Sequence, residues 1–220
     1  MKPITQYSFP ADQYVQEETE KKQIYLHHTA GNPDPFGTFD WWASNSDRIA
    51  TCIVIGGRST SGKWTDGQIV QGYSSKFWAF HLGLKAAVFE AKRVPYLKLD
   101  KFSIGIETCN WGQLTLGADG IFKNYVNRPV PPSEVCELDK PFKGFKYYHA
   151  YTDAQIESIY ELLIFWKQRY NIPLTYNPDI WDVSARALRG EPGVYTHNSV
   201  RPDKNDMSPQ PKLVAMLKSL

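Results

Sequence analysis

Hydrophobic and polar residues alternate along residues 23–28, and this stretch ends in two histidines. Ile24 and Leu26 are separated by more polar neighbours, which is the period-two pattern of a half-buried β-strand. The Gly-Asn-Pro sequence at residues 31–33 then predicts a turn. A strand that stops in histidine at the edge of a loop can offer imidazole nitrogens to a cleft, so the functional interpretation of the chain begins here.

Helices are marked by their first residues and by apolar positions three or four residues apart. Asp34 and Pro35 suit an N-cap followed by proline in the first turn. The apolar face of that helix carries Phe36, Phe39 and Trp42. Thr152 and Gln155 have the capping-box spacing and open a longer helix that ends near residue 171. Shorter helices are predicted over residues 179–189 and 211–220.

Further strands are predicted over residues 49–57, 68–73 and 102–110 from their β-branched content and turn signals. Residues 1–22 are polar, and we interpret them as an exposed lead-in with at most one helical turn. Residues 111–148 are rich in proline and aromatic residues, which predicts an insertion packed on the domain that can wall one side of a cleft. Together these elements indicate a single α/β domain over residues 1–220.

Composition excludes several classes of protein. The 220 residues carry a net charge of +2, so no global field favours nucleic acid. The three cysteines form no CxxC pair, which argues against a disulfide framework and for a reducing compartment. The N-terminus has no apolar segment typical of a signal peptide, and no run is long enough to span a membrane. We therefore expect the protein to be cytoplasmic as synthesised.

The candidate chemistry is that of a metal site. His27 and His28 are adjacent on a strand and point to opposite faces, so they do not easily bind one ion together. The best additional ligands, His197 and Asp206, lie near the other end of the chain. One strand histidine with these two would give three protein ligands and leave a fourth position for water, which is the pattern of a catalytic zinc.

The order of these motifs resembles that of the zinc N-acetylmuramoyl-L-alanine amidases, a superfamily that includes phage lysozyme-like amidases and animal peptidoglycan recognition proteins. The resemblance runs from about residue 24 to 209, apart from residues 111–148. It is carried by four segments in order, namely Ile24-Tyr25-Leu26-His27-His28-Thr29-Ala30-Gly31, residues 78–83, Ser103-Ile104-Gly105-Ile106-Glu107, and His197 with Lys204-Asn205-Asp206.

The resemblance implies one zinc per chain, with His27, His197 and Asp206 as ligands. It further implies that Glu107 is the general base and that Lys204 stabilises the oxyanion. The implied fold is a mixed central sheet with helices on both faces and the zinc at the bottom of a groove. The implied substrate is the amide between the lactyl group of N-acetylmuramic acid and L-alanine in peptidoglycan.

Three features depart from the family pattern. Residues 207–209 read Met-Ser-Pro where Pro-Gly is common, and the spacing from Trp78 to His81 is one residue longer than usual. Thr51 stands where the lysozyme-like branch has a catalytic tyrosine, which favours Glu107 as the base. His28, His81 and Trp42 are weaker candidates for contact with substrate, because each also suits a structural position.

Two classes of function follow from the resemblance. The first is a peptidoglycan hydrolase, either an endolysin of a phage or prophage or a cytosolic amidase that recycles cell-wall fragments. The second is a recognition module that keeps the groove without catalysis. Modules of that kind typically lack a metal ligand, whereas His27, His197 and Asp206 are all present here, so the sequence favours the enzyme.

Overall fold

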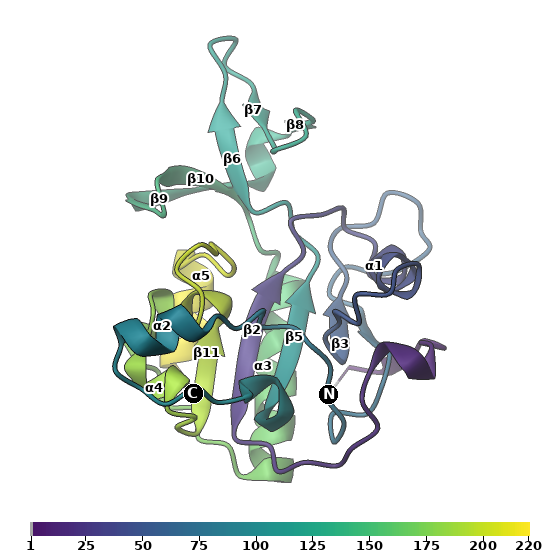
Figure 1. The fold of residues 1–220 in the computed structure, drawn as a ribbon. Coiled ribbons are helices and arrows are strands. Elements are labelled where there is room, and N and C mark those ends of the chain that lie inside the picture. Colours follow the sequence, from purple (N-terminus) through teal and green to yellow (C-terminus); the bar gives the residue numbers. More distant parts are fainter. Residues whose placement is uncertain (1) are drawn as a thin grey trace.

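A computed structural model describes residues 2–220, which form a central sheet with helices around it and a second sheet that projects from one end (Figure 1). The central sheet has six strands in the order β1-β4-β3-β5-β2-β11. Their bounds are β1 Ile4–Gln6, β2 Gln23–His28, β3 Ile53–Ile55, β4 Ile69–Gln71, β5 Ser103–Thr108 and β11 Gly193–Thr196. The pairs are parallel except for β3 with β4, so the sheet is mixed, as predicted.

Strand β2 lies between β5 and β11 and is buried along its whole length. The prediction of a half-buried strand is therefore wrong. A strand inside a parallel sheet is covered on both faces, so its polar residues are buried as well as its apolar ones. The register pairs Leu26 with Ile106 and His27 with Glu107, which brings the ends of β2 and β5 to the same edge of the sheet.

The helices begin where the capping residues predict. Asp34 accepts hydrogen bonds from the backbone N–H groups of Phe36 and Gly37 at the start of α1, and Thr152 forms the complete capping box of α3. Helix α3 runs behind the sheet in Figure 1 and buries Ile159, among other residues, against it. The α-helices are α1 Pro35–Ala43, α2 Ala86–Ala91, α3 Asp153–Tyr170, α4 Ala185–Leu188 and α5 Pro211–Lys218, and the short 3-10 helices are η1 Ala11–Gln13, η2 Leu99–Phe102, η3 Pro132–Glu134, η4 Pro178–Trp181 and η5 His197–Ser199.

The single helix predicted over residues 179–189 is wrong, because two short helices, η4 and α4, stand in its place. Ser184 caps α4 by accepting a hydrogen bond from the Ala187 N–H. The Asp179 carboxylate in turn accepts from the Ser184 hydroxyl and from Arg186. These side-chain hydrogen bonds offer the backbone an alternative to a continuous helix.

Residues 2–22 do more than lead into the domain. The predicted helical turn is η1, but β1 also adds a parallel edge strand to β4, pairing Ile4 with Ile69. Phe9, which lies between β1 and η1 in the sequence, is buried in the core. The interpretation of an exposed lead-in therefore holds for only part of the described segment 2–22.

Residues 113–149 contain a second, antiparallel sheet with the strand order β8-β7-β6-β10-β9. Figure 1 shows that it projects beyond the strand ends of the central sheet. Its strands are β6 Gln113–Leu116, β7 Phe122–Lys123, β8 Pro129–Val130, β9 Val135–Phe142 and β10 Phe145–His149.

None of the helices in residues 2–220 is both long enough and apolar enough to cross a membrane.

Candidate active site

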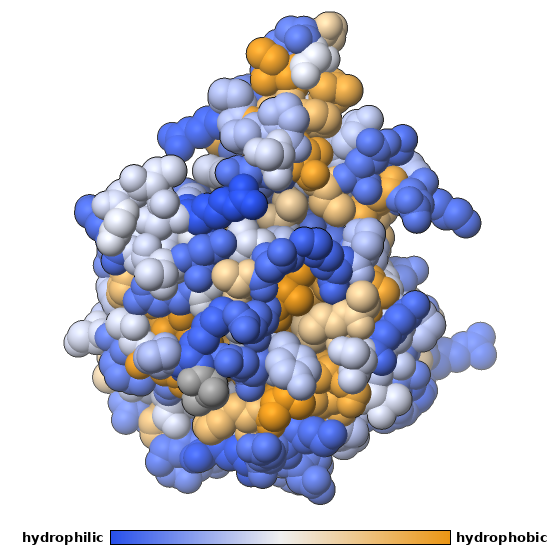
Figure 2. Space-filling view, turned by 180° about the vertical axis from the view of Figure 1, so that it is seen from behind, coloured by the Kyte–Doolittle hydropathy of each residue, from blue (hydrophilic) through white to orange (hydrophobic). Residues whose placement is uncertain are grey.

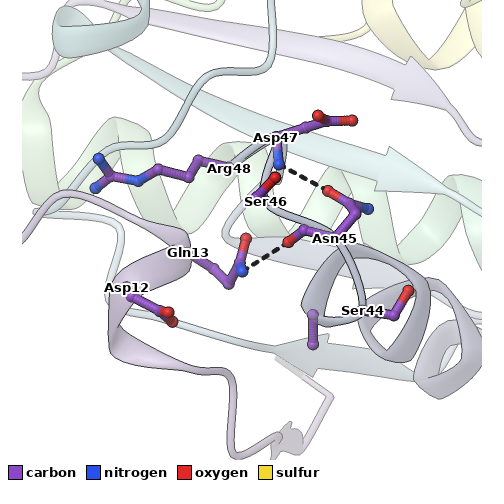
Figure 3. Close-up of a pocket in the computed structure, with 8 residues that line it drawn as sticks. Asp12, Gln13, Ser44, Asn45, Ser46, Asp47 and Arg48 are labelled. Atoms are coloured by element: carbon purple, nitrogen blue, oxygen red, sulfur yellow. Dashed lines mark hydrogen bonds between the residues drawn. The ribbon is translucent and has the colours of Figure 1, made fainter.

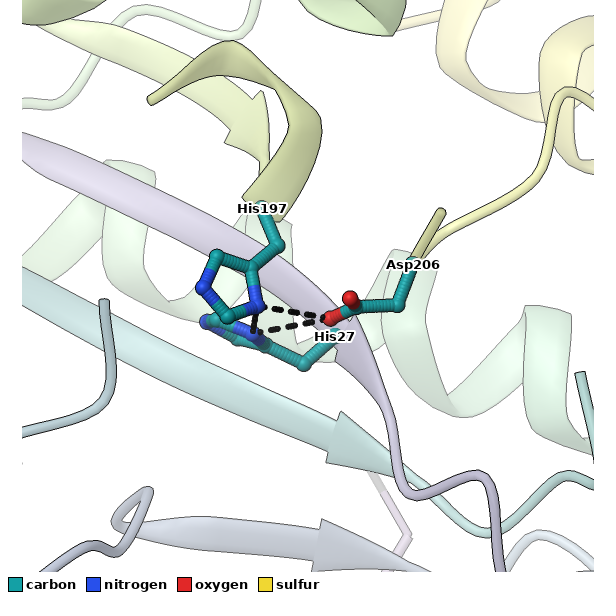
Figure 4. A group of neighbouring side chains, drawn as sticks. All are labelled: His27, His197 and Asp206. Carbon is teal, nitrogen blue, oxygen red and sulfur yellow. Dashed lines mark hydrogen bonds and ion pairs between the residues drawn. The ribbon is translucent and has the colours of Figure 1, made fainter. Parts of the chain in front are cut away.

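Three side chains from distant parts of the chain meet at the carboxyl-terminal ends of β2 and β11 (Figure 4). His27 stands near the end of β2, His197 begins η5 directly after β11, and Asp206 lies in the loop that follows. The two Nδ1 atoms are 3.1 Å apart, and Asp206 Oδ2 lies 3.2 Å from His27 Nδ1 and 2.9 Å from His197 Nδ1. All three residues are buried.

Nδ1 of each imidazole faces Asp206. Hydrogen bonds on the far side of the two rings determine which nitrogen of each ring carries the hydrogen. His197 Nε2 lies 3.0 Å from the Leu82 carbonyl, which can only accept, so Nε2 carries the hydrogen. The Ser103 hydroxyl donates to the Asp100 carbonyl and therefore accepts from His81 Nε2. His81 Nδ1 then accepts from His27 Nε2 at 3.0 Å. In the neutral rings, both Nδ1 lone pairs consequently point toward Asp206.

The electrostatics of the cluster suit a cation. Burial lowers the pKa of His27 to about 4, with a smaller contribution from neighbouring His197, so the ring is neutral at pH 7. Burial alone would raise the pKa of Asp206, but positive charge beside it at the His197 and His27 positions, together with N–H groups that donate to it, holds that pKa well below the usual value. Two imidazole nitrogens and a carboxylate oxygen thus lie within 4.8 Å of one another, close enough to bind one ion together.

The donor set fits zinc, which takes neutral imidazole nitrogen and carboxylate oxygen in tetrahedral sites. Bonds of roughly 2.0–2.1 Å in such a site place the ligand atoms about 3.3 Å apart. The separations of 2.9–3.2 Å between the three donor atoms are close to that value. The backbone around Asp206 is held by Asn198, whose buried amide donates to the carbonyls of Asp206 and Met207 at 3.0 Å.

Glu107 and Lys204 line the same cleft as the three clustered residues. Glu107 is the β5 residue directly beside His27, and its side chain is buried. Burial raises the pKa of Glu107 well above its usual value, the charge of Asp206 raises it further, and Lys204 acts in the opposite direction. Lys204 lines the cleft, and within residues 2–220 its ammonium forms no ion pair.

The cleft has a volume of about 930 Å³ and extends well beyond the cluster. Of the weaker candidates, His81 is buried behind His27, and Trp42 is buried with its ring 5.5 Å from that of Phe39. His28 is also buried and hydrogen-bonds through Nδ1 to the Tyr151 hydroxyl at 2.8 Å. All three border the cleft, but their principal contacts are within the protein.

Two cleft residues escaped the sequence analysis. Trp41 is 63% exposed and Tyr125 is 58% exposed, and both line the cleft. The spacing of apolar residues in α1 singled out Trp42 on its core face. Trp41, on the solvent face, could have been recognised as an unusual exposed aromatic residue. Tyr125 lies in the projecting sheet, where no pattern in the sequence related it to the histidines.

A second hollow lies between η1 and the end of α1, away from the histidines (Figure 3). Gln13 Nε2 donates to the Asn45 carbonyl there at 2.9 Å, and the Asp47 N–H donates to Asn45 Oδ1 at 3.0 Å. Its lining residues are Asp12, Gln13, Ala43, Ser44, Asn45, Ser46, Asp47 and Arg48. None of them is a histidine or cysteine, so this hollow lacks the imidazole donors of the first.

Comparisons with known proteins agree with the geometry. Residues 17–211 match the family model of the N-acetylmuramoyl-L-alanine amidases. The fold is similar to that of PlyL, with 12% identity, a TM-score of 0.54, and coverage of 99% of this chain and 96% of that one. It is also similar to the N-acetylmuramoyl-L-alanine amidase LysC from Clostridium intestinale, with 12% identity, a TM-score of 0.50, and coverage of 98% and 95%.

A further similar structure is the amidase AmiD from E. coli in complex with the substrate anhydro-N-acetylmuramic acid-L-Ala-D-γ-Glu-L-Lys. Its identity to this chain is 19% and its TM-score is 0.50, over 90% of this chain and 57% of that one. No curated protein sequence matches the chain. At such identities the structural likeness concerns the fold.

Proposed function

Because the chain belongs to the N-acetylmuramoyl-L-alanine amidase family, we propose that it is a zinc-dependent hydrolase of peptidoglycan. The bond cut is the amide between the lactyl group of N-acetylmuramic acid and L-alanine. One observation carries the proposal: His27, His197 and Asp206 converge in a cleft that Glu107 and Lys204 also line. The muropeptide bound by AmiD contains the same linkage, which supports this substrate class.

In this proposal His27, His197 and Asp206 hold the zinc ion. Bound zinc supplies a Lewis acid and lowers the pKa of a water molecule to roughly 7. Glu107 accepts the proton of the attacking water while the water oxygen bonds to the carbonyl carbon, and it returns a proton to the alanine nitrogen as the C–N bond breaks. Its raised pKa suits a carboxyl that must hold this proton between the two transfers.

Lys204 meets the negative charge that develops on the carbonyl oxygen. The loop that carries it is braced, because Asp203 is paired with Arg201 and with Lys85 at 2.7 Å and 3.0 Å. On the other side, Asn205 Nδ2 donates to Gln113 Oε1 at 2.8 Å and ties the loop to the second sheet. These contacts of its neighbours hold the backbone of Lys204 beside the cleft, so that its side chain starts from a fixed position.

We propose an endolysin of a phage or prophage as the biological setting, with cytosolic recycling of cell-wall fragments as the second candidate. Both use the same bond and the same residues. A non-catalytic peptidoglycan-binding module is the least favoured, because the metal donors, Glu107 and Lys204 all border one cleft.

The experiment that tests the proposal compares Asp206→Ala with Lys204→Met. Asp206→Ala leaves two histidine ligands and is expected to lose zinc and activity together. Lys204→Met is expected to keep zinc while turnover falls about 10²–10³-fold, as when one oxyanion donor is removed. Zinc content and turnover on the same two preparations measure both effects.

Either of two results would contradict these assignments. Full zinc in Asp206→Ala places the third ligand elsewhere, and His28 and Cys109 would be the next residues to replace. Loss of zinc in Lys204→Met shows that the lysine holds the loop in place and leaves the oxyanion role without support.

A further inference from the structure

The cleft contains two aromatic rings that the amidase chemistry does not use. Trp41 and Tyr125 have the largest exposed fractions, 63% and 58%, among the large exposed hydrophobic side chains of the described residues. Both border the cleft that contains His27, His197 and Asp206. Two exposed aromatic rings that border one cleft offer a ligand there flat apolar surface to pack against.

Both rings are held on fixed backbone. Trp41 is on α1, where its carbonyl accepts hydrogen bonds from Ser44 and Asn45 at 2.7 Å and 3.0 Å. Tyr125 lies in the turn between β7 and β8. The buried Asn124 shapes that turn by accepting from the backbone N–H groups of residues 126 and 128 at 3.2 Å and 2.9 Å. Binding to such positions requires little ordering of the protein.

Figure 2 shows that hydrophobic surface gathers on the projecting second sheet. The sheet carries the exposed side chains Leu116, Ile121, Tyr125 and Val126. Its connection to the cleft is direct, because Gln113 at the start of β6 and Tyr125 both line it. The second sheet therefore extends one wall of the active-site cleft.

The cleft that these rings line also carries three uncharged amides, Asn32, Gln113 and Asn205. The hydrogen bond between Asn205 and Gln113 leaves Asn205 Oδ1 and Gln113 Nε2 without a partner in residues 2–220. Lys204 is the only lysine or arginine among the described residues that line the cleft, which also include three carboxylates. An anionic peptide would be attracted electrostatically only by Lys204 and repelled by the three carboxylates. An uncharged ligand would experience neither effect.

Sugar rings are complementary to a cleft that combines exposed aromatic rings with uncharged amides. A pyranose presents an apolar C–H face that packs on an aromatic ring, and its hydroxyl and acetamido groups pair with amides. The cleft volume of about 930 Å³ is near the upper end of the roughly 300–1,000 Å³ typical of small-ligand sites. This volume is large enough for more of the substrate than the one amide linkage that is cut.

We propose that the cleft continues from the metal cluster into a glycan-binding site, in which Trp41 and Tyr125 stack against N-acetylated sugar rings that neighbour the cleaved muramoyl residue. The enzyme then acts preferentially on the polymer rather than on released muropeptides, which favours cell-wall lysis over recycling. The polymer's identity as peptidoglycan rests on the proposed function, whereas the stacking site itself does not.

The first test is binding of glycan strands from which all peptides have been removed. These strands contain no amide for an amidase to cut at the lactyl group, so the wild-type protein can be used. Trp41→Ala and Tyr125→Ala are each expected to weaken binding about tenfold, the effect of losing one well-packed aromatic contact. Tyr160→Ala is the matched control, because Tyr160 is 42% exposed on α3 and does not line the cleft.

The second test compares turnover on intact sacculi and on a monomeric muropeptide. Each cleft variant is expected to lose at least fivefold more rate on sacculi than on the monomer, while Tyr160→Ala changes neither. Unaltered glycan binding in both cleft variants, or equal losses on the two substrates, would overturn the glycan site. Wild-type protein that binds the strands but cuts neither substrate would instead overturn the amidase proposal alone.

Discussion

At the residue scale, the orientation of His27 depends on groups that do not touch the proposed metal. The hydrogen-bond chain runs from His27 through His81 and Ser103 to the Asp100 carbonyl. The Asp100 carboxylate also accepts from the N–H groups of His81 and Leu82 at 2.9 Å and 3.0 Å, which fixes the backbone of His81. We therefore interpret His81 as a positioning residue for the ligand imidazole.

His81→Phe keeps a flat ring but removes the acceptor for His27 Nε2–H. Zinc affinity is expected to fall about 10–100-fold, the usual effect of losing such a partner. His81→Gln can present an amide oxygen and should recover part of the affinity. Zinc titration measures both, and His149→Phe serves as a control, because His149 contacts Glu134 and not the cluster. Equal affinity in His81→Phe and wild type would show that His81 does not orient the ligand.

Glu107→Gln retains the size of the side chain but cannot accept a proton. If Glu107 is the general base, turnover falls about 10²–10⁴-fold with zinc content and fold unchanged. Glu137→Gln, at an exposed position of β9, is the matched control and should have wild-type turnover. Near-full activity of Glu107→Gln on sacculi would assign the residue a structural role and require another base.

The sequence singled out His27, His197 and Asp206 because the motifs occur in a recognisable order. The structure places them within 4.8 Å of one another. The hydrogen-bond chain behind His27 could not be predicted, since Ser103 and Asp100 carry no signal of their own. Trp41 and Tyr125 were missed for a related reason: exposure and proximity across the cleft depend on how two separate elements are placed.

At the element scale, the site exists because parallel strands bring their carboxyl ends to one edge. His27, Glu107 and His197 each lie at or just after the end of a central strand. The strong local signals predicted α1 and α3 well, because capping residues act over three or four positions. Edge strand β1 and the second sheet were not predicted, because short strands are stabilised by partners distant in sequence rather than by local pattern.

Thr152 caps α3, the longest helix. Its hydroxyl oxygen accepts from the Gln155 N–H at 3.0 Å, and the hydroxyl donates to the Asp66 carboxylate at 2.8 Å. Thr152→Ala is expected to lower the free energy of unfolding by about 1 kcal/mol without altering turnover per folded molecule. Denaturant unfolding measures the change, and Thr115→Ala at an exposed position of β6 is the control. An unchanged unfolding midpoint would mean that the capping box contributes nothing to stability.

At the scale of the whole molecule, the cleft lies where the central sheet meets the second sheet. The link between Asn205 and Gln113 joins the Asp206 loop to β6, and the Tyr151 hydroxyl connects His28 with Ser208 of the same loop. The cluster of His27, His197 and Asp206 is therefore connected to the projecting sheet by hydrogen bonds, although the two come from distant segments of the sequence.

The central claim is that zinc at His27, His197 and Asp206 supports cleavage of the bond between N-acetylmuramic acid and L-alanine. Digestion of purified sacculi followed by mass analysis of the released ends tests it most directly. The account predicts new L-alanine amino termini and intact lactyl carboxylates, lost when a chelator removes the zinc and restored when zinc is added. Cleavage at a glycosidic bond or within the peptide, or full activity in protein verified to be free of metal, would contradict it.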